Sequence, residues 1–500
     1  VVVVPRIVAA FTTPIADCDG DTLCLTFTEV FNYWEPAHLL MYGRGLQVWE
    51  YSPEYGLRSY FYVGLYATLG QLVQLLVDHK IWIFYGIRLT LSLICATCEL
   101  RFIRGAASRF GRTAGFYLSI FLGLSSGMFH ASPAFLPQSF TLCTILLCFR
   151  HWMDGKYHWA IWWMGVSALV GWPFSGLLAL PLAFDILAHH WPPSFALFRA
   201  FVAASISALL CVVPSVLIDH YYYDRWLLAI INIAVYNAFG TGAQLYGVAP
   251  WTYYIHNLFL NFNVAAVLAA AAPVAVLVVY CKRKRVKALA NSHNEDLFWL
   301  LKLYSPLVIW MSLMFLMDHK EERFLYVVYP LICLAAAFTL TVLVPSASSS
   351  VCARLRHLLA GLFVLVFVSL SLSRSMALVV NYQAPLQVYP QLVREHQYGF
   401  KAGSDVNVCV GKEWYRFPSH FFMPENPRWR LQFIRSDFTG LLPKYYEAPP
   451  PEGTALLPRG FNDRNQQDPS RYVDVALCDF VVDLDLPDQQ EEHFYRNGEE

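Results

Sequence analysis

The amino-acid sequence predicts an α-helical protein that crosses a membrane many times. Hydrophobic residues make up 57% of the 500 positions and charged residues only 14%, whereas soluble domains are usually about 45–50% apolar and about 25% charged. A membrane-spanning helix needs about 20 mainly apolar residues, and we expect about eleven such segments. They lie at residues 1–16, 81–101, 113–130, 137–150, 157–171, 173–189, 197–218, 264–281, 298–317, 325–344 and 358–374.

The charge balance excludes two other classes of protein. The 36 Lys and Arg residues equal the 36 Asp and Glu residues, so the formal net charge is zero. A nucleic-acid-binding protein would need a basic surplus, and a disordered chain would need low hydrophobicity. The 12 Cys residues in 500 positions are also too few for a disulfide-rich scaffold.

The distribution of Lys and Arg orients the predicted spans. Basic residues gather at 101–112, 282–287 and 354–356, and short cytosolic loops are enriched in such residues. Placing these three segments on the cytosolic side puts the long first loop, residues 17–80, on the opposite face. For this topology to hold, the apolar stretch 57–78 must lie along the membrane surface or re-enter it, rather than cross.

The composition changes near residue 375, where we place a domain boundary. Residues 1–375 form the predicted membrane-spanning catalytic part, and residues 376–500 lose the apolar runs and gain charge and Pro. Because the last span ends on the non-cytosolic side, this second part should lie on that face. We expect it to be a small α/β domain.

Two segments of the second part show the alternation of apolar and polar residues that is typical of strands. They are residues 405–410 and 472–485. Each contains one cysteine, Cys409 and Cys478, in a compartment that permits disulfide bonds. A disulfide between them and two buried free thiols are both compatible with the sequence.

The acidic first loop carries one candidate group of residues for chemistry. Asp19 and Glu29 follow the first predicted span, and Tyr33, Trp34 and Glu35 come shortly after. A carboxylate within hydrogen-bond reach of a hydroxyl can act as a general base, and the aromatic rings could stack on sugar rings. A solvated acidic loop with an aromatic belt at the membrane interface explains the same residues.

A second candidate group lies between two strong spans, in the segment DHKEERF. Charged side chains are costly in the bilayer, about 2.5–3.5 kcal/mol each at its centre, so their presence there needs a reason. His319, Lys320 and Arg323 could hold a phosphate, and Glu321 and Glu322 could orient them. The alternative is a loop of mutually neutralising charges among the lipid headgroups.

A third polar and aromatic region extends from residue 218 to residue 263 and includes Asp219 and Trp251. Its aromatic density suits a groove for a lipid or a sugar, and a plain interfacial belt explains it nearly as well. The sequence has no Gly-rich nucleotide-binding loop and no zinc-binding spacing. We therefore expect no nucleotide sugar bound on a Rossmann domain.

Four segments closely resemble glycosyltransferase family 22, in particular its dolichol-phosphate-mannose-dependent α-1,2-mannosyltransferases of asparagine-linked glycosylation. The segments are FNYWEPAHLLMYGRGLQVWEYSPEYGLRSY (31–60), GWPFSGLLALPLAFDIL (171–187), HKEERFLYVVYPLI (319–332) and FIRSDFTGLLPKYYE (433–447). The resemblance covers nearly the whole chain. It implies the multispan GT-C fold, a location in the endoplasmic reticulum membrane, and activity without a metal or another cofactor.

The resemblance also implies a reaction. Mannose would pass with inversion from dolichyl phosphate mannose to a 2-hydroxyl of mannose on a dolichol-diphosphate-linked oligosaccharide, as the seventh and ninth mannose. Asp19 and Glu29 would be the catalytic carboxylates, although the family has them adjacent and residues 20–28 separate them here. The two carboxylates could still be close in space, or Asp21 could take the place of one of them, and we favour a tolerated bulge or an artefact of the gene sequence. The alternatives are a transporter or flippase of lipid-linked sugar, a family member of another linkage, and an inactive relative.

Overall fold

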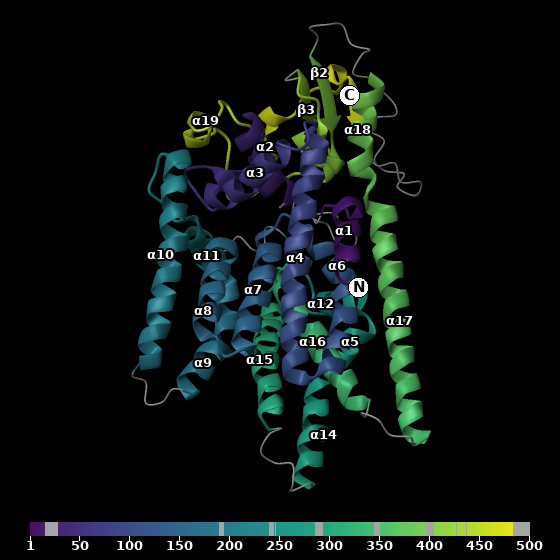
Figure 1. The fold of residues 1–500 in the computed structure, drawn as a ribbon. Helices are drawn as coiled ribbons and strands as arrows, with labels where there is room; N and C mark the ends of the chain where they lie inside the picture. The colour runs from purple at the N-terminus through teal and green to yellow at the C-terminus, as the bar shows by residue number, and fades with distance from the viewer. Residues whose placement is uncertain are drawn as a thin grey trace.

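The computed structural model describes residues 1–15, 29–189, 195–239, 245, 247–285, 294–344, 351–396, 405–426, 428–436 and 438–483. These residues are mainly helical, and the longest helices run in a common direction (Figure 1). The helices are α1 (Val3–Thr12), α2 (Glu35–Tyr42), α3 (Tyr60–Gln74), α4 (Lys80–Phe110), α5 (Arg112–Leu124), α6 (Ser126–Ala131), α7 (Pro137–Met153), α8 (Tyr157–Val166), α9 (Leu180–His189), α10 (Phe195–Tyr223), α11 (Ala229–Phe239), α12 (Thr252–Phe262), α13 (Val264–Ala270), α14 (Ala272–Arg285), α15 (Asn294–Leu316), α16 (Tyr329–Leu343), α17 (Val351–Tyr382), α18 (Ala384–His396) and α19 (Glu452–Ala455).

Within the described ranges, five helical segments are long and apolar enough to cross a membrane. A bent pair, α13 with the first part of α14, meets at 48° and is a sixth candidate. Other predicted spans, such as 113–130 and 157–171, form the shorter helices α5 and α8. The multispan helical prediction is confirmed, while the number of about eleven spans stays a prediction. The five segments are Lys80–Phe110, Leu197–Tyr223, Trp299–Leu316, Glu322–Leu343 and Arg354–Arg394.

Charged side chains inside the helical bundle are held by partners. Arg6 of α1 and Glu99 of α4 form a fully buried ion pair with an N–O distance of 2.7 Å. Arg88 of α4 donates from Nη2 to the carbonyl oxygen of Thr13, at 2.8 Å. Such pairing is how ionisable groups are tolerated at membrane depth, and here both contacts fix α1 against α4.

The apolar stretch 57–78 forms α3, which lies with α2 across one end of the long helices (Figure 1). Ser59 caps this helix, because its hydroxyl accepts a hydrogen bond from the Phe61 backbone N–H at 3.2 Å. The carboxylate of Asp219 on α10 accepts from the Tyr60 N–H at 2.7 Å. These contacts satisfy N–H groups that a helix start leaves open, and α3 has the length and place expected of a surface helix.

The strands gather at the same end of the molecule as α2 and α3 (Figure 1). Three of them form a parallel sheet in the order β3-β2-β5, and β1 of the first loop pairs antiparallel with β4. α17 passes the boundary predicted at residue 375 before the strands begin. The strands are β1 (Leu46–Gln47), β2 (Val406–Val410), β3 (Trp429–Phe433), β4 (Lys444–Tyr445) and β5 (Phe480–Val482).

The two strand predictions differ in their outcome. Residues 405–410 correspond to β2. Of residues 472–485, only Phe480–Val482 is a strand, and the residues before it include a short 3₁₀ turn, Val475–Leu477. A disulfide joins Cys409 in β2 to Cys478, just before β5, with 5.8 Å between their Cα atoms. The bond therefore ties together two strands that pair in the sheet.

Candidate active site

A cavity of about 390 Å³ lies between the first loop and the segment that follows α15. The first and second candidate groups of the sequence, which are nearly 300 positions apart, both contribute to it. Apolar residues of α15 and of the 3₁₀ helix Pro173–Ala179 complete its walls. Its polar and aromatic lining includes Asn32, Tyr33, Trp49, Glu50, Arg58, Gln138, Trp172, Phe174, Tyr236, Asn237, His319, Glu321, Arg323 and Phe324.

One wall of the cavity, which we call the cationic wall, consists of His319, Glu321 and Arg323. The Glu321 carboxylate receives His319 Nε2 at 2.7 Å on one oxygen and Arg323 Nη2 at 2.5 Å on the other. His319 Nδ1 lies 2.9 Å from the carbonyl oxygen of Gly247. Both ring nitrogens thus face oxygens that only accept hydrogen bonds, which favours the imidazolium form.

The protonation states of this wall follow from the same contacts. Burial alone lowers the pKa of His319, but the hydrogen bond and charge of Glu321 outweigh it and raise that pKa above 6.5. Burial alone raises the pKa of Glu321, but Arg323 and His319 hold it below its ordinary value. Two cations therefore contact the Glu321 carboxylate, and an imidazolium beside a guanidinium suits a phosphate.

The neighbouring residues Lys320 and Glu322 do not line the cavity. Lys320 donates to the backbone carbonyl oxygens of Ala249, at 3.2 Å, and of Met317, and it is not among the residues that line the cavity. Glu322 accepts from Asn261 Nδ2 at 2.8 Å and from the Tyr329 hydroxyl at 3.2 Å. The structure thus brings His319, Glu321 and Arg323 together at the cavity, while Lys320 and Glu322 support the surrounding backbone and helices.

A second group of lining residues, which we call the first-loop wall, consists of Tyr33, Trp49, Glu50 and Arg58. Arg58 donates from Nε and Nη2 to the two oxygens of Glu50, at 2.7 and 3.1 Å, and from Nη1 to the Tyr33 hydroxyl at 2.7 Å. Burial alone lowers the pKa of Arg58, but Glu50 raises it, so the guanidinium stays charged. The sequence argument did not single out Glu50 and Arg58, although both lie in the segment WEYSPEYGLR that carries the family resemblance.

The two predicted catalytic carboxylates have different places. Glu29 is buried, and its Oε1 accepts hydrogen bonds from Trp34 Nε1 at 3.0 Å and from the Phe135 backbone N–H at 2.9 Å. Glu29 does not line the cavity. Its hydrogen bonds join the start of the FNYW segment to the residues just before α7. Asp19 and the residues 20–28 lie outside the described part of the chain.

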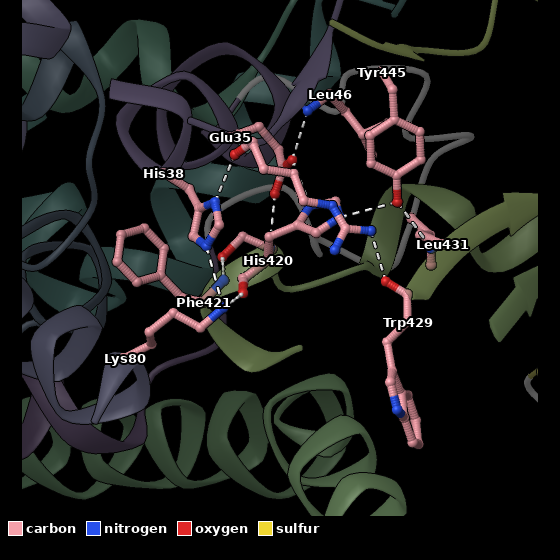
Figure 2. A network of polar contacts seen from close by, with 11 residues as sticks. Glu35, His38, Leu46, Lys80, His420, Phe421, Trp429, Leu431 and Tyr445 are labelled. Atoms are coloured by element: carbon pink, nitrogen blue, oxygen red, sulfur yellow. Dashed lines mark hydrogen bonds and ion pairs between the residues drawn. The ribbon is translucent and has the colours of Figure 1, made fainter. Parts of the chain in front are cut away.

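Glu35 joins the first loop to the C-terminal segment (Figure 2). Its carboxylate accepts from the Leu46 N–H, from the His420 N–H and from His420 Nδ1, each at 2.8 Å. Burial lowers the pKa of His420 despite this carboxylate, so the ring is neutral and Nε2 accepts from the Tyr445 hydroxyl at 3.0 Å. Lys80 donates to the His420 carbonyl oxygen at 3.0 Å. Glu35 therefore has a structural role, because it holds the first loop against the C-terminal segment.

The remaining predicted residues do not line the cavity. Asp219 is buried and holds the first turn of α3. Trp251, at the start of α12, is 63% exposed. Among the residues that the structure describes, no three His, Cys, Asp or Glu side chains gather closely enough to hold a metal ion.

Comparison with known proteins places this site in a family. The model of the Alg9-like mannosyltransferase family matches residues 1–424. The chain belongs to this family. Among curated relatives of this mannosyltransferase, the mouse α-1,2-mannosyltransferase ALG9 is 42% identical over 501 residues, which cover 96% of this chain and 77% of the mouse protein. The fission yeast α-1,2-mannosyltransferase alg9 is 36% identical over 97% of this chain and 84% of its own length.

A solved structure shows the same fold. The ArnT protein of Cupriavidus metallidurans, determined with bound undecaprenyl phosphate, superposes with a TM-score of 0.52 at 11% identity, over 86% of this chain and 84% of ArnT. The predicted GT-C fold is thereby confirmed, and the mannosyltransferase is a multispan membrane protein. Family membership favours the glycosyltransferase interpretation over the transporter, other-linkage and inactive alternatives.

Proposed function

We propose that this chain transfers mannose from dolichyl phosphate mannose, in α-1,2 linkage and with inversion, to a dolichol-diphosphate-linked oligosaccharide during N-glycan precursor assembly. The reaction would take place at the lumenal face of the endoplasmic reticulum membrane and add the seventh and ninth mannose. The observation that carries the proposal is the cavity shared by the first loop and the cationic wall, in a chain whose curated relatives are α-1,2-mannosyltransferases.

The cationic wall suits the leaving phosphate of the donor. As the bond to the anomeric carbon breaks, negative charge grows on the phosphate, and fixed cations stabilise that charge more than the ground state. His319 and Arg323 are held in place by Glu321 before any substrate arrives. The apolar lining next to them, with Leu313, Leu316 and Met317, is compatible with the first part of a lipid chain.

The attacking hydroxyl needs a base from the first loop. Of the two carboxylates predicted from the sequence, Glu29 already accepts two hydrogen bonds from the protein and lies away from the cavity lining. We therefore propose Asp19 as the base, with Glu29 shaping the segment that carries it. Positioned base catalysis is typically worth about 10²–10⁴-fold in rate.

A transfer assay tests this function. The purified chain receives dolichyl phosphate mannose and a lipid-linked acceptor that ends in mannose, and the product is analysed by mass and by digestion with an α-1,2-specific mannosidase. We expect one added hexose that the mannosidase removes, and a loss of about 10²–10⁴-fold in kcat for Asp19→Ala. A product resistant to the mannosidase would refute the linkage, and full activity of Asp19→Ala would refute the base.

A variant that lacks residues 20–28 separates a defective insertion from a wrong function. If only this deletion variant makes the product, the proposed activity stands and the insertion is a defect of this sequence. If neither form adds a hexose to the acceptor, the proposed function is wrong.

A further inference from the structure

The two walls of the cavity differ in their charged groups. On the cationic wall, His319 and Arg323 both contact the carboxylate of Glu321. On the first-loop wall, Glu50 and Arg58 form an ion pair. A phosphate is attracted to the two cations of the first wall and meets a carboxylate at the second, so the charged end of a substrate and an uncharged sugar would be sorted to different walls.

Glu50 retains capacity for hydrogen bonds. A carboxylate offers about four lone-pair sites, and Glu50 uses two of them to accept hydrogen bonds from the guanidinium nitrogens Nε and Nη2 of Arg58. The side chain of Glu50 is 19% exposed and lines the cavity. Because two hydrogen bonds from Arg58 hold its carboxylate in place, Glu50 can accept hydrogen bonds from sugar hydroxyls without reorganising.

Aromatic side chains surround this carboxylate. Trp49, the preceding residue, packs edge-on against Tyr55 at 5.0 Å and in a tilted arrangement against Tyr236 of α11 at 5.5 Å between ring centroids. Trp49 and Tyr236 line the cavity beside Glu50. Aromatic walls with a few fixed polar groups are typical of small-molecule sites, and this combination suits a sugar ring with C–H and O–H groups on its surface.

The first-loop wall is also backed by the C-terminal segment. Trp49 and Leu57 form a small apolar cluster with Leu441, and Tyr236 and Phe461 pack against it. This wall is therefore joined to the C-terminal segment, whose strands lie at the same end of the molecule as α2 and α3.

From these contacts we propose that the first-loop wall is the subsite for the terminal mannose of the acceptor, with Glu50 as its specificity-determining residue. Glu50 accepts hydrogen bonds from hydroxyls of that mannose other than the one that reacts, and Arg58 is the positioning residue that holds it. The inference rests on the proposed function and adds to it the place where the acceptor binds.

Steady-state kinetics of Glu50→Gln test the proposal, with Glu54→Gln as the matched control. Glu54 is exposed, lies in the same loop and does not line the cavity. A hydrogen bond to a charged group is worth about 1.5–3 kcal/mol, or roughly 10- to 100-fold. We expect Glu50→Gln to raise the acceptor KM by that factor at unchanged donor KM, and Glu54→Gln to change neither.

Each other outcome overturns the assignment. A rise in donor KM alone would place Glu50 on the donor sugar, and a fall in kcat at unchanged KM values would make it a catalytic group. Unchanged constants in a folded Glu50→Gln would remove the subsite. A wild-type chain that forms no product would instead refute the proposed function, so the two failures are distinguishable.

A second variant covers the case in which Glu50→Gln does not fold because it leaves Arg58 with a neutral partner. Glu50→Asp keeps the charge and shortens the side chain by one carbon. We expect Glu50→Asp to fold and to raise the acceptor KM by less than Glu50→Gln does. Removing one non-reacting hydroxyl from the terminal mannose of the acceptor should weaken binding to Glu50→Asp by less than it weakens binding to the wild type. An unchanged acceptor KM in folded Glu50→Asp would overturn the proposal.

Discussion

His319 and His420 are both partly or fully enclosed histidines that lie beside a glutamate, yet they take opposite protonation states. His319 faces oxygens on both ring nitrogens, and its pKa is raised. His420 lies between Glu35 and the hydroxyl of Tyr445, and its pKa is lowered. Burial, together with the nearby charges of Arg44 and Lys80, outweighs Glu35 at His420, whereas Glu321 outweighs burial at His319.

The same difference distinguishes the cavity around His319 from the structural contacts around His420. The His319 side chain is 14% exposed and lines the cavity, whereas that of His420 is 1% exposed. Around His420, the strand pair β1–β4 and the hydrogen bond from Arg44 to the Trp429 carbonyl oxygen, at 2.6 Å, close the junction between the first loop and the C-terminal segment. The charged groups around His319 line a cavity, whereas those around His420 are paired inside the protein.

The largest effect is expected from removing the guanidinium of the cationic wall. Arg323→Gln should lower kcat by about 10²–10³-fold, the usual cost of losing one group that stabilises developing negative charge. Lys320→Gln should lower kcat by less than about tenfold, because Lys320 donates to backbone carbonyl oxygens and such hydrogen bonds typically stabilise by about 1 kcal/mol. Single-turnover rates of both purified variants measure the contrast.

Arg323→Lys is the companion variant. It keeps the charge but loses the planar fork, and its rate should lie between wild type and Arg323→Gln. If Lys320→Gln were as slow as Arg323→Gln, the phosphate role predicted for Lys320 from the sequence would stand, and the division between cavity and support residues would be wrong.

A smaller effect, on stability rather than rate, is expected at the junction. Glu35→Gln replaces a fully buried carboxylate that accepts three hydrogen bonds, and one amide oxygen cannot serve all three donors. We expect the free energy of unfolding to fall by about 1–3 kcal/mol. Thermal unfolding in detergent, followed by tryptophan fluorescence, measures this loss.

Glu54→Gln again serves as the control, since substitutions of exposed residues usually stay within about 0.5 kcal/mol. An equal melting temperature for Glu35→Gln and Glu54→Gln would contradict the proposed contribution of Glu35 to stability. A large loss of kcat with unchanged stability would move Glu35 to the catalytic machinery.

The sequence predicted well those features that depend on local pattern. Apolar runs located the long helices, and period-2 alternation located β2, because burial imposes these patterns directly on neighbouring residues. The segment DHKEERF was predicted to be a candidate site because charge between two spans is costly. The sequence pattern could not predict which of these side chains line the cavity. Their directions depend on the 3₁₀ helix Glu322–Val328 and on hydrogen bonds to the backbone of Gly247 and Ala249.

Contacts between distant segments could not be predicted in the same way. Glu35 and His420 are 385 positions apart, and nothing in the residues around Glu35 identifies its partner. β3 was missed, because WRLQF is short and its parallel partner β2 lies more than 20 positions earlier. Glu50 and Arg58 lacked a distinguishing pattern, and only the fold shows that they line the same cavity as Arg323.

The smallest effect separates the two histidines by pH. Because the pKa of His319 is raised above 6.5, its imidazolium is complete below that pH and is lost as the pH rises through the raised value. A neutral ring would weaken its hydrogen bonds by about 1 kcal/mol, so kcat/KM should fall about fivefold on the alkaline side. His420, whose pKa is lowered, should instead reduce stability as the pH falls below 6.5, where the unfolded chain takes up the proton first. A pH–rate profile of His319→Gln without the alkaline fall, and a pH–stability profile of His420→Gln that is flatter below pH 6.5, are the expected results. An alkaline fall that persists in His319→Gln would show that another group titrates there, and the contrast between the two rings would not explain it.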